Sequence, residues 1–233
     1  PAHIEDADVT NIFRGGFGDY SRDELQEMLR NPDRRVRLRA QYELVDRGEI
    51  TSLLEVAFSD GLSTADTVQR LHGLWGLAMA YRAGYPVDGE RFIALLLQTA
   101  DSEVRAHASR VIGELGLVAA SPRLMRQVAS GTPREQYFAA IALGSMNAAG
   151  ATPVLVDLLA ANDDRDLYLR HAAIVGLSRC SKAAEEMLAL QEDPRPAVRL
   201  GAVLVLRRLR DARVALFLDD DDPAIATEAA RAI

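Results

Sequence analysis

Two histidines, His72 and His107, stand at equivalent positions of a sequence repeat and are the residues best placed for metal chemistry. A zinc ion needs each ligating nitrogen within about 2.1 Å. Neighbouring helices lie roughly 10 Å apart, which is too wide unless the two rings reach toward each other, and no third ligand is evident. We therefore expect no metal site. His171 lies one position off this register and is expected to pack or hydrogen-bond, and His3 lies in an irregular start.

Carboxylates gather at Asp219–Asp222, as they do in calcium-binding loops. An EF-hand, however, needs alternating ligands, a glycine in mid-loop and a distal glutamate. Pro223 follows the run instead, and proline is common at the first position of a helix. We interpret this run, and also Asn162–Asp164, as a turn that caps the next helix.

No catalytic constellation is evident in the sequence. No nucleophile has a base at a recognisable spacing, and Gly15–Gly18 lacks the preceding strand and long helix of a dinucleotide site. We predict a protein that is not an enzyme and that needs no cofactor. Arg207, Arg208 and Arg210 form the strongest basic cluster, which could meet an acidic partner or a neighbouring domain. We favour contact with the acidic 219–222 turn or with solvent.

These residues are spaced by a recurring pattern, Asp-x-x-x-Arg-x-x-Ala/Gly. Its centres are separated by 33, 35, 31, 34, 29 and 27 residues, which leaves room for two short helices and two turns per unit. Self-similarity at such a period is the signature of a repeat array. Degraded copies centre on Ala139, Ala202 and Ala229. The four complete copies are Asp33–Arg37–Ala40, Asp66–Arg70–Gly73, Asp101–Arg105–Ala108 and Asp166–Arg170–Ala173.

Each residue type in the pattern has a structural reason. Aspartate at the start of the second helix can accept orphan backbone N–H groups, and arginine four residues later can reach that aspartate or the one in the next unit. A small centre lets two helices approach closely. Thr132 and Gln136 replace Asp and Arg in the fourth unit and Arg195 replaces Asp in the sixth, so we expect weaker polar ties there. Aliphatic residues that continue the buried stripe are Val36, Val104, Leu169, Val198 and Ile225 after the aspartate, and Leu44, Leu77, Ile112, Leu143, Leu177, Leu206 and Ile233 after the centre.

The predicted fold is all-α, a right-handed superhelix (solenoid) of about seven helix pairs. Residues 1–20 are expected to be irregular, with Phe13, Phe17 and Tyr20 against the first unit, and residues 21–233 to form a single array. The first helices are expected at residues 21–30, 49–59, 88–99, 121–130, 152–161, 181–190 and 211–218. The second helices are expected at residues 34–47, 65–81, 102–115, 133–146, 165–179, 195–209 and 223–233.

Helix boundaries carry recognisable signals. Ser21 and Glu24 form a capping box, and Ser121–Pro122 and Thr152–Pro153 are expected as N-caps followed by proline. The expected C-terminal stops are Gly48, Gly84 and Gly116.

Composition narrows the function classes. The net charge of −7 and the pI near 5.2 argue against a nucleic-acid surface, which needs clustered positive charge. Cys180 is the one cysteine, so no internal disulfide can form. No apolar run reaches the 18 or so residues of a membrane helix. The chain starts at Pro1 without a methionine and stops at Ile233 inside a helical pattern, and we interpret it as a piece of a longer protein.

The paired helices and the opening Asp101-Ser-Glu-Val-Arg105 resemble HEAT repeats over about residues 21–233. The 70–77, 104–108, 166–173 and 198–211 segments further resemble the HEAT region of bacterial PVC-type multidomain proteins. In that family a dehydrogenase-like propeller precedes the array and a haem-binding Cys-x-x-Cys-His domain follows it. Cys180 is followed by Ser-Lys-Ala, so any redox activity of such a parent would lie outside this chain. The narrower resemblance implies an exported or periplasmic protein; otherwise a cytoplasmic one is expected.

Second helices line the concave side of a HEAT solenoid, so a column of outward positions on them is the candidate partner-binding face. Positions −1 and +6 from each centre are expected to face away from the buried stripe, with Ala172, Gly201 and Ser145 among them. Trp75 is expected to pack against a neighbouring unit, as Tyr42 does one unit earlier, although an anchor at the groove edge is the alternative. The candidate residues are Arg39, Asp46, His72, Met79, His107, Arg110, Glu114, Phe138, Arg179 and Arg208.

The sequence thus predicts a non-catalytic scaffold that binds a protein partner or packs between flanking domains, with neither nucleic-acid binding nor membrane insertion. The alternative is a HEAT-like lyase acting on a bound pigment, or a DNA-repair solenoid. A DNA role requires a basic concave face, which the acidic total disfavours. A pigment role requires a large apolar groove.

Overall fold

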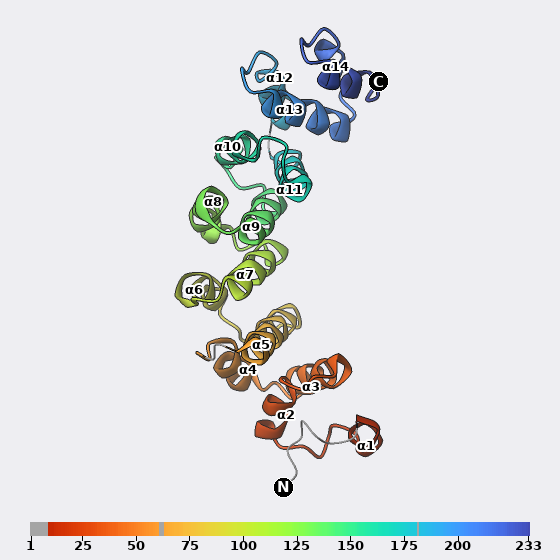
Figure 1. Ribbon diagram of the computed structural model, residues 1–233. Helices are drawn as coiled ribbons and strands as arrows, with labels where there is room; N and C mark the ends of the chain where they lie inside the picture. The colour runs from red at the N-terminus through yellow and green to blue at the C-terminus, as the bar shows by residue number, and fades with distance from the viewer. Residues whose placement is uncertain (1–8, 61–62, 181) are drawn as a thin grey trace. The chain divides into compact units, whose positions relative to one another are not determined.

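The computed structural model describes residues 9–60, 63–180 and 182–233, and this part of the chain contains helices and no strand (Figure 1). It divides into two compact units, Pro1–Val111 and Ile112–Ile233, and their boundary falls inside helix α7. The all-α prediction is therefore confirmed. The assignment of residues 21–233 to a single array stays a prediction. No helix among the described residues is both long and apolar enough to cross a bilayer.

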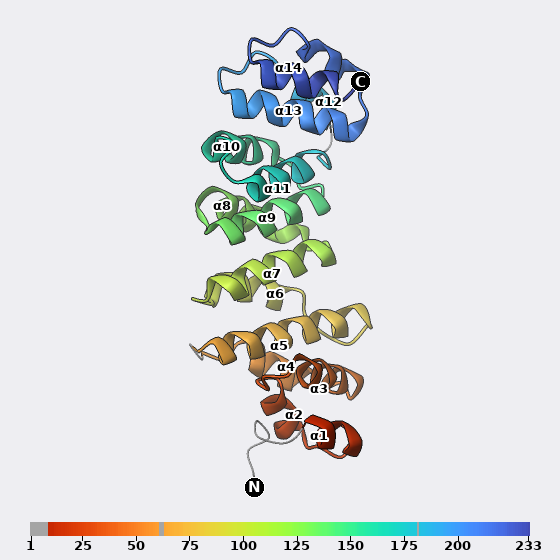
Figure 2. The ribbon, with the colours of Figure 1, turned by 45° about the vertical axis from the view of Figure 1, so that its right-hand side comes forward.

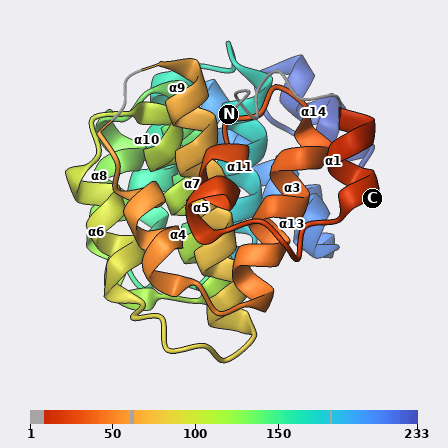
Figure 3. The ribbon, with the colours of Figure 1, turned by 90° about the horizontal axis from the view of Figure 1, so that it is seen from below.

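The first unit stacks helices in two layers. First helices α4 and α6 lie to one side of second helices α5 and α7 (Figure 1 and Figure 3). The helices of this unit are α1 (Val9–Gly15), α2 (Arg22–Met28), α3 (Arg34–Asp46), α4 (Ile50–Ala57), α5 (Thr64–Arg82), α6 (Glu90–Gln98) and the first part of α7 (Ser102–Leu115).

The second unit repeats the arrangement, and α13 contacts α10, α11, α12 and α14 (Figure 2). The first helix of the seventh repeat was expected to be an α-helix. It is instead a short 3₁₀ helix, a conformation that occurs in runs of a few residues. The elements are η2 (Val118–Ala120), α8 (Ser121–Ser130), α9 (Pro133–Ser145), α10 (Thr152–Asn162), α11 (Leu167–Leu177), α12 (Ala183–Leu188), α13 (Pro196–Leu209), η3 (Ala212–Phe217) and α14 (Pro223–Ala230).

The N-terminal segment is more ordered than expected. Residues 1–20 were expected to be irregular because of their glycines, but α1 occupies Val9–Gly15, so Gly15 ends a helix instead of preventing one. Phe17 is buried, whereas Phe13 is exposed. The Arg47 guanidinium donates to the carbonyl oxygens of Phe17, Gly18 and Tyr20 at 2.8–2.9 Å. These bonds fasten the segment to the end of α3.

The repeat centres lie at the core. Every centre is buried, and so is every aliphatic residue of the two predicted sets except Ile233, which is 76% exposed. Helix α14 ends at Ala230, short of the expected residue 233, so Ile233 does not continue the helix face. The buried stripe is thus confirmed in six of the seven units.

Aspartates cap most of the second helices. Asp33 accepts from the backbone N–H of Arg35 at 2.7 Å, and Asp166 accepts from those of Tyr168 and Leu169. The second sequence repeat differs, because its second helix, α5, begins earlier, at Thr64. Asp66 there is the third helical residue, and it forms a capping box with Ser63.

Two expected N-caps are wrong. Ser121 and Thr152 are the first residues of α8 and α10, and the cap positions belong to Ala120 and Ala151. The Ser121 hydroxyl donates to the Val118 carbonyl at 2.7 Å, and Thr152 donates to Glu186 at 2.6 Å. Neither helix has a side-chain cap hydrogen bond. The capping box of Ser21 with Glu24 is confirmed, as are the positive-φ stops at Gly48, Gly84 and Gly116.

Arg37 and Arg105 bond to carbonyl groups of the turn that precedes their own helix. Arg37 donates to the carbonyl oxygens of Asn31 and Pro32 at 2.6 and 2.8 Å, and Arg105 makes the equivalent pair of bonds six and five residues back. The expected reach to the next unit is seen at Arg70, whose guanidinium lies 3.9 Å from Asp101. Gln136, which replaces arginine in the fourth unit, donates to the Val128 carbonyl at 2.8 Å.

Candidate functional site

Helices α5 and α7 bring His72, Trp75 and His107 into one stack. The ring of Trp75 meets His72 edge-on at 5.1 Å and His107 at 5.3 Å between centroids. Both histidines are buried and Trp75 is half-buried. Packing of Trp75 against the neighbouring unit is confirmed, whereas Tyr42, one unit earlier, is exposed.

Hydrogen bonds hold the His72 ring neutral. Arg37 Nε donates to His72 Nε2 at 3.2 Å, so Nδ1 carries the proton that is shared with Gln41 Oε1 at 2.7 Å. Burial, followed by the nearby Arg37 and Arg34 guanidinium groups, lowers the pKa of His72 to about 4. This histidine is a structural link between α3 and α5. No three His, Cys, Asp or Glu side chains of the described residues gather as a metal site would require.

The −1 positions are mostly buried. We expected them to face outward, but His72, His107, Ala172 and Gly201 are buried. A second helix packs against its own first helix and against the neighbouring second helices, so the covered sector is wide enough to include the residue before the centre. At this position Arg39 is exposed and Phe138 is half-buried.

The +6 positions do lie outward. Met79 is half-buried and its sulfur accepts from Gln41 Nε2 at 3.0 Å. Arg110, from the candidate set but in neither column, is exposed as well. The exposed +6 residues are Asp46, Glu114, Ser145, Arg179 and Arg208. Whether they bind a partner stays a prediction.

A groove that the sequence did not single out lies between α11 and α13 of the second unit. Its volume is about 420 Å³. His171, expected to pack or hydrogen-bond, is exposed here, and Arg208 lies with it. The lining residues are Leu167, Arg170, His171, Ile174, Leu204, Arg207 and Arg208. The sequence contains a partial signal for this groove. Arg170 and Ile174, and likewise Leu204 and Arg208, are a cationic and an aliphatic residue four positions apart on a helix. The sequence alone does not show that the two pairs face each other.

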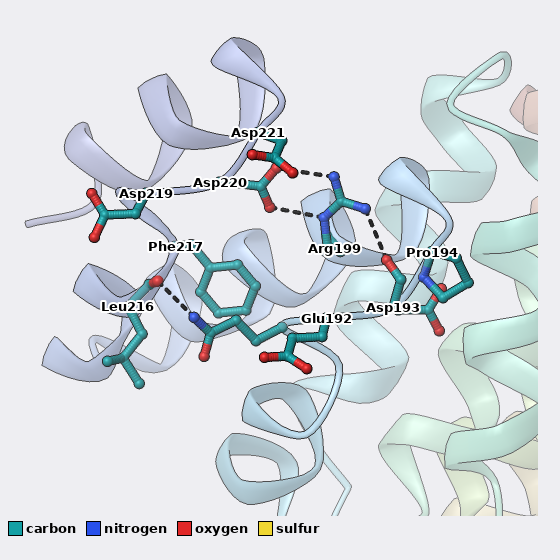
Figure 4. Close-up of a pocket in the computed structure, with 10 residues that line it drawn as sticks. Glu192, Asp193, Pro194, Arg199, Leu216, Phe217, Asp219, Asp220 and Asp221 are labelled. Atoms are coloured by element: carbon teal, nitrogen blue, oxygen red, sulfur yellow. Dashed lines mark hydrogen bonds and ion pairs between the residues drawn. The ribbon is translucent and has the colours of Figure 1, made fainter.

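The acidic 219–222 turn has the structural role that was expected. Asp222 caps α14, and Arg199 donates to the two oxygens of Asp220 at 2.8 and 3.0 Å (Figure 4). This hydrogen bonding lowers the pKa of Asp220. Of the two contacts expected for the basic cluster, solvent is confirmed, because Arg207, Arg208 and Arg210 are exposed, and Arg207 also pairs with Glu228 of α14. The Asn162–Asp164 turn does not itself cap the next helix, because Asp166 is the N-cap of α11, and Asp164 pairs with Arg170.

A pocket of about 390 Å³ beside this turn is lined by five carboxylates and Arg199 (Figure 4). Arg199 also donates to the Asp193 carbonyl at 2.8 Å, and Gln191 donates to the Leu216 carbonyl at 2.8 Å. The first bond joins α13 to the turn before it, and the second joins that turn to η3. The polar groups at the centre of this pocket are therefore engaged in holding the fold. His3 lies outside the described residues.

Residues 89–178 match the family model described as HEAT repeats. A search of curated proteins found no match. The matched stretch runs from the residue before α6 to the residue after α11, and this part of the chain is similar to HEAT repeats. The match gives no support to the narrower resemblance to PVC-type proteins.

Proposed function

We propose, from the HEAT repeats of residues 89–178, that the chain is a non-catalytic module that presents its second helices to a protein partner. HEAT repeats commonly serve as protein-interaction scaffolds, and a stack of helix pairs offers an extended surface. The absence of catalysis is part of this proposal.

The observation that carries the proposal is the division of labour between repeat positions. The aspartates and arginines of the pattern are engaged in caps and in bonds to carbonyl groups, as Asp166 and Arg105 show. The outward +6 residues change from unit to unit in charge, from Asp46 through Glu114 to Arg208. A constant frame with varying exposed side chains suits recognition of a particular partner.

Site-specific photo-crosslinking in cells that naturally make the protein tests this proposal. A benzophenone side chain would replace Asp46 on α3 or Arg208 on α13, both exposed on second helices. The matched controls would be Thr51 on α4 and Arg126 on α8, both exposed on first helices. We expect protein adducts of defined mass at the second-helix positions and few at the first-helix positions.

Adducts confined to the first helices would overturn the choice of face. Absence of adducts from all four positions, with the protein folded and expressed, would overturn the scaffold role itself. Each variant would be checked for helix content by circular dichroism, so that loss of fold is separated from loss of contact.

A role between flanking domains, which the narrower resemblance implies, is a further hypothesis. The full-length gene product tests it directly. A propeller before this region and a Cys-x-x-Cys-His domain after it would support the hypothesis, and their absence would leave a HEAT protein of the general kind.

A further inference from the structure

The α11–α13 groove combines an apolar floor with a cationic rim. Leu167, Ile174 and Leu204 supply the apolar surface, and Leu167 is 60% exposed although it is a large aliphatic residue. No carboxylate is among the lining residues. This composition contrasts with the chain as a whole, whose net charge is −7.

The rim is only partly neutralised by the protein itself. Arg170 pairs with Asp164, and Arg207 pairs with Glu228 at 2.9 Å. Arg208 and His171 are exposed, and no hydrogen bond or ion pair joins either side chain to the described residues. Two groove groups therefore have donors open to an incoming acceptor.

We propose that this groove binds an acidic peptide segment that carries an aliphatic or aromatic side chain. The proposal rests on the scaffold function above and names the partner's chemistry. Carboxylates of the segment pair with Arg208 and its neighbours, and the apolar side chain enters the space between α11 and α13. A volume of about 420 Å³ is within the range of small-molecule and side-chain pockets.

The apolar floor favours a peptide over nucleic acid. Phosphate recognition needs many clustered cations and works through long-range charge, which an acidic protein opposes. An aliphatic floor contributes nothing to a phosphate backbone, but it is where an interface anchor residue gains its binding energy.

Selection from a random 12-residue peptide display library against the full chain tests the inference. We expect the enriched peptides to combine several aspartates or glutamates with a leucine, isoleucine or phenylalanine. Synthetic copies, labelled with fluorescein, should lose binding at least tenfold to Arg208→Glu and severalfold to Leu167→Ser. Both positions are exposed, so the fold should survive.

Arg126→Glu is the matched control, because it makes the same charge change at an exposed site on first helix α8 of the same unit. It should leave peptide binding within about twofold. Peptides that are basic or uncharged, or that bind Arg208→Glu as well as the parent, would overturn the inference. So would duplex DNA binding that Arg208→Glu abolishes, or a dimer in light scattering that the same substitution dissociates.

Failure here is distinguishable from failure of the proposed function. A partner could crosslink at Asp46 or Arg208 and yet bind Arg208→Glu and Leu167→Ser as tightly as the parent protein. That result would support the scaffold function and contradict peptide binding in the α11–α13 groove. No crosslinking at any position would reject the scaffold.

Discussion

Three of the repeat arginines donate to the turn that precedes their own helix. Arg37, Arg105 and Arg199 each donate to a carbonyl oxygen six residues earlier. Sequence spacing suggested pairing with the aspartate at i−4, but that aspartate already accepts from backbone N–H groups of the first turn, as Asp33 does. The guanidinium therefore satisfies carbonyl groups that the turn leaves unpaired.

Protonation of His72 should destabilise the first unit. Its pKa is about 4 in the folded chain and about 6.5 when unfolded, so the unfolded state binds more protons between these values. The contribution of neutral His72 to the free energy of unfolding is fully present above pH 6.5 and is lost as the pH falls toward 4. This loss is at most about 3 kcal/mol. Urea unfolding at pH 7 and pH 4.5 should show this loss in the parent and a smaller pH dependence in His72→Gln. An equal pH dependence in the two proteins would contradict the assignment.

Removal of Arg199 should leave Asp220 as a buried, uncompensated carboxylate. Its side chain is only 4% exposed. We expect Arg199→Met to lower the free energy of unfolding by about 3 kcal/mol. Arg195→Met is the control, because Arg195 is 45% exposed and pairs with Asp193 at the surface, where such pairs contribute at most about 1 kcal/mol. If urea denaturation showed equal losses in the free energy of unfolding for the two variants, the Arg199–Asp220 pair would contribute no more than a surface pair.

The boundaries of the helices along the chain could be predicted from the sequence, but the way in which the helices pack against one another could not. The boundaries of α3 and α7 follow from the aspartate caps and the aliphatic stripe, which are local signals. The burial of His107 depends on how closely α5 and α7 pack, and a single helix does not encode that. The α11–α13 groove was missed for the same reason, since it is created only when two helices lie side by side.

Close helix contact in the second unit depends on small residues. A Cβ added at Gly144 would lie 2.6 Å from the Gly176 Cα, so α9 and α11 meet backbone to backbone. We expect Gly144→Val to cost about 2–3 kcal/mol through overpacking. Ser145→Ala, at the exposed neighbouring position, should change stability by less than about 0.5 kcal/mol. Chemical denaturation distinguishes these outcomes, and a neutral Gly144→Val would mean that the helices can separate without loss.

For the whole molecule, the repeat pattern established the all-α class and the pairing of helices, because a period of about 30 residues with buried small centres has few other solutions. The function is less determined. The repeat fold does not constrain the exposed residues of the second helices. Their charges and hydrophobicity therefore indicate the chemistry of a partner but do not identify the partner.

The central claim is that repeat positions hold the fold while outward second-helix positions bind. Measuring both the thermal unfolding midpoint and the affinity for the crosslinked partner in four variants tests it most directly. Asp166→Ala and Arg199→Met should lower the midpoint and leave affinity nearly unchanged in the folded protein. Asp46→Lys and Arg208→Glu should leave the midpoint nearly unchanged, and at least one should weaken binding about tenfold. If affinity instead followed stability across all four, or if only the repeat variants lost binding, the claim would be contradicted.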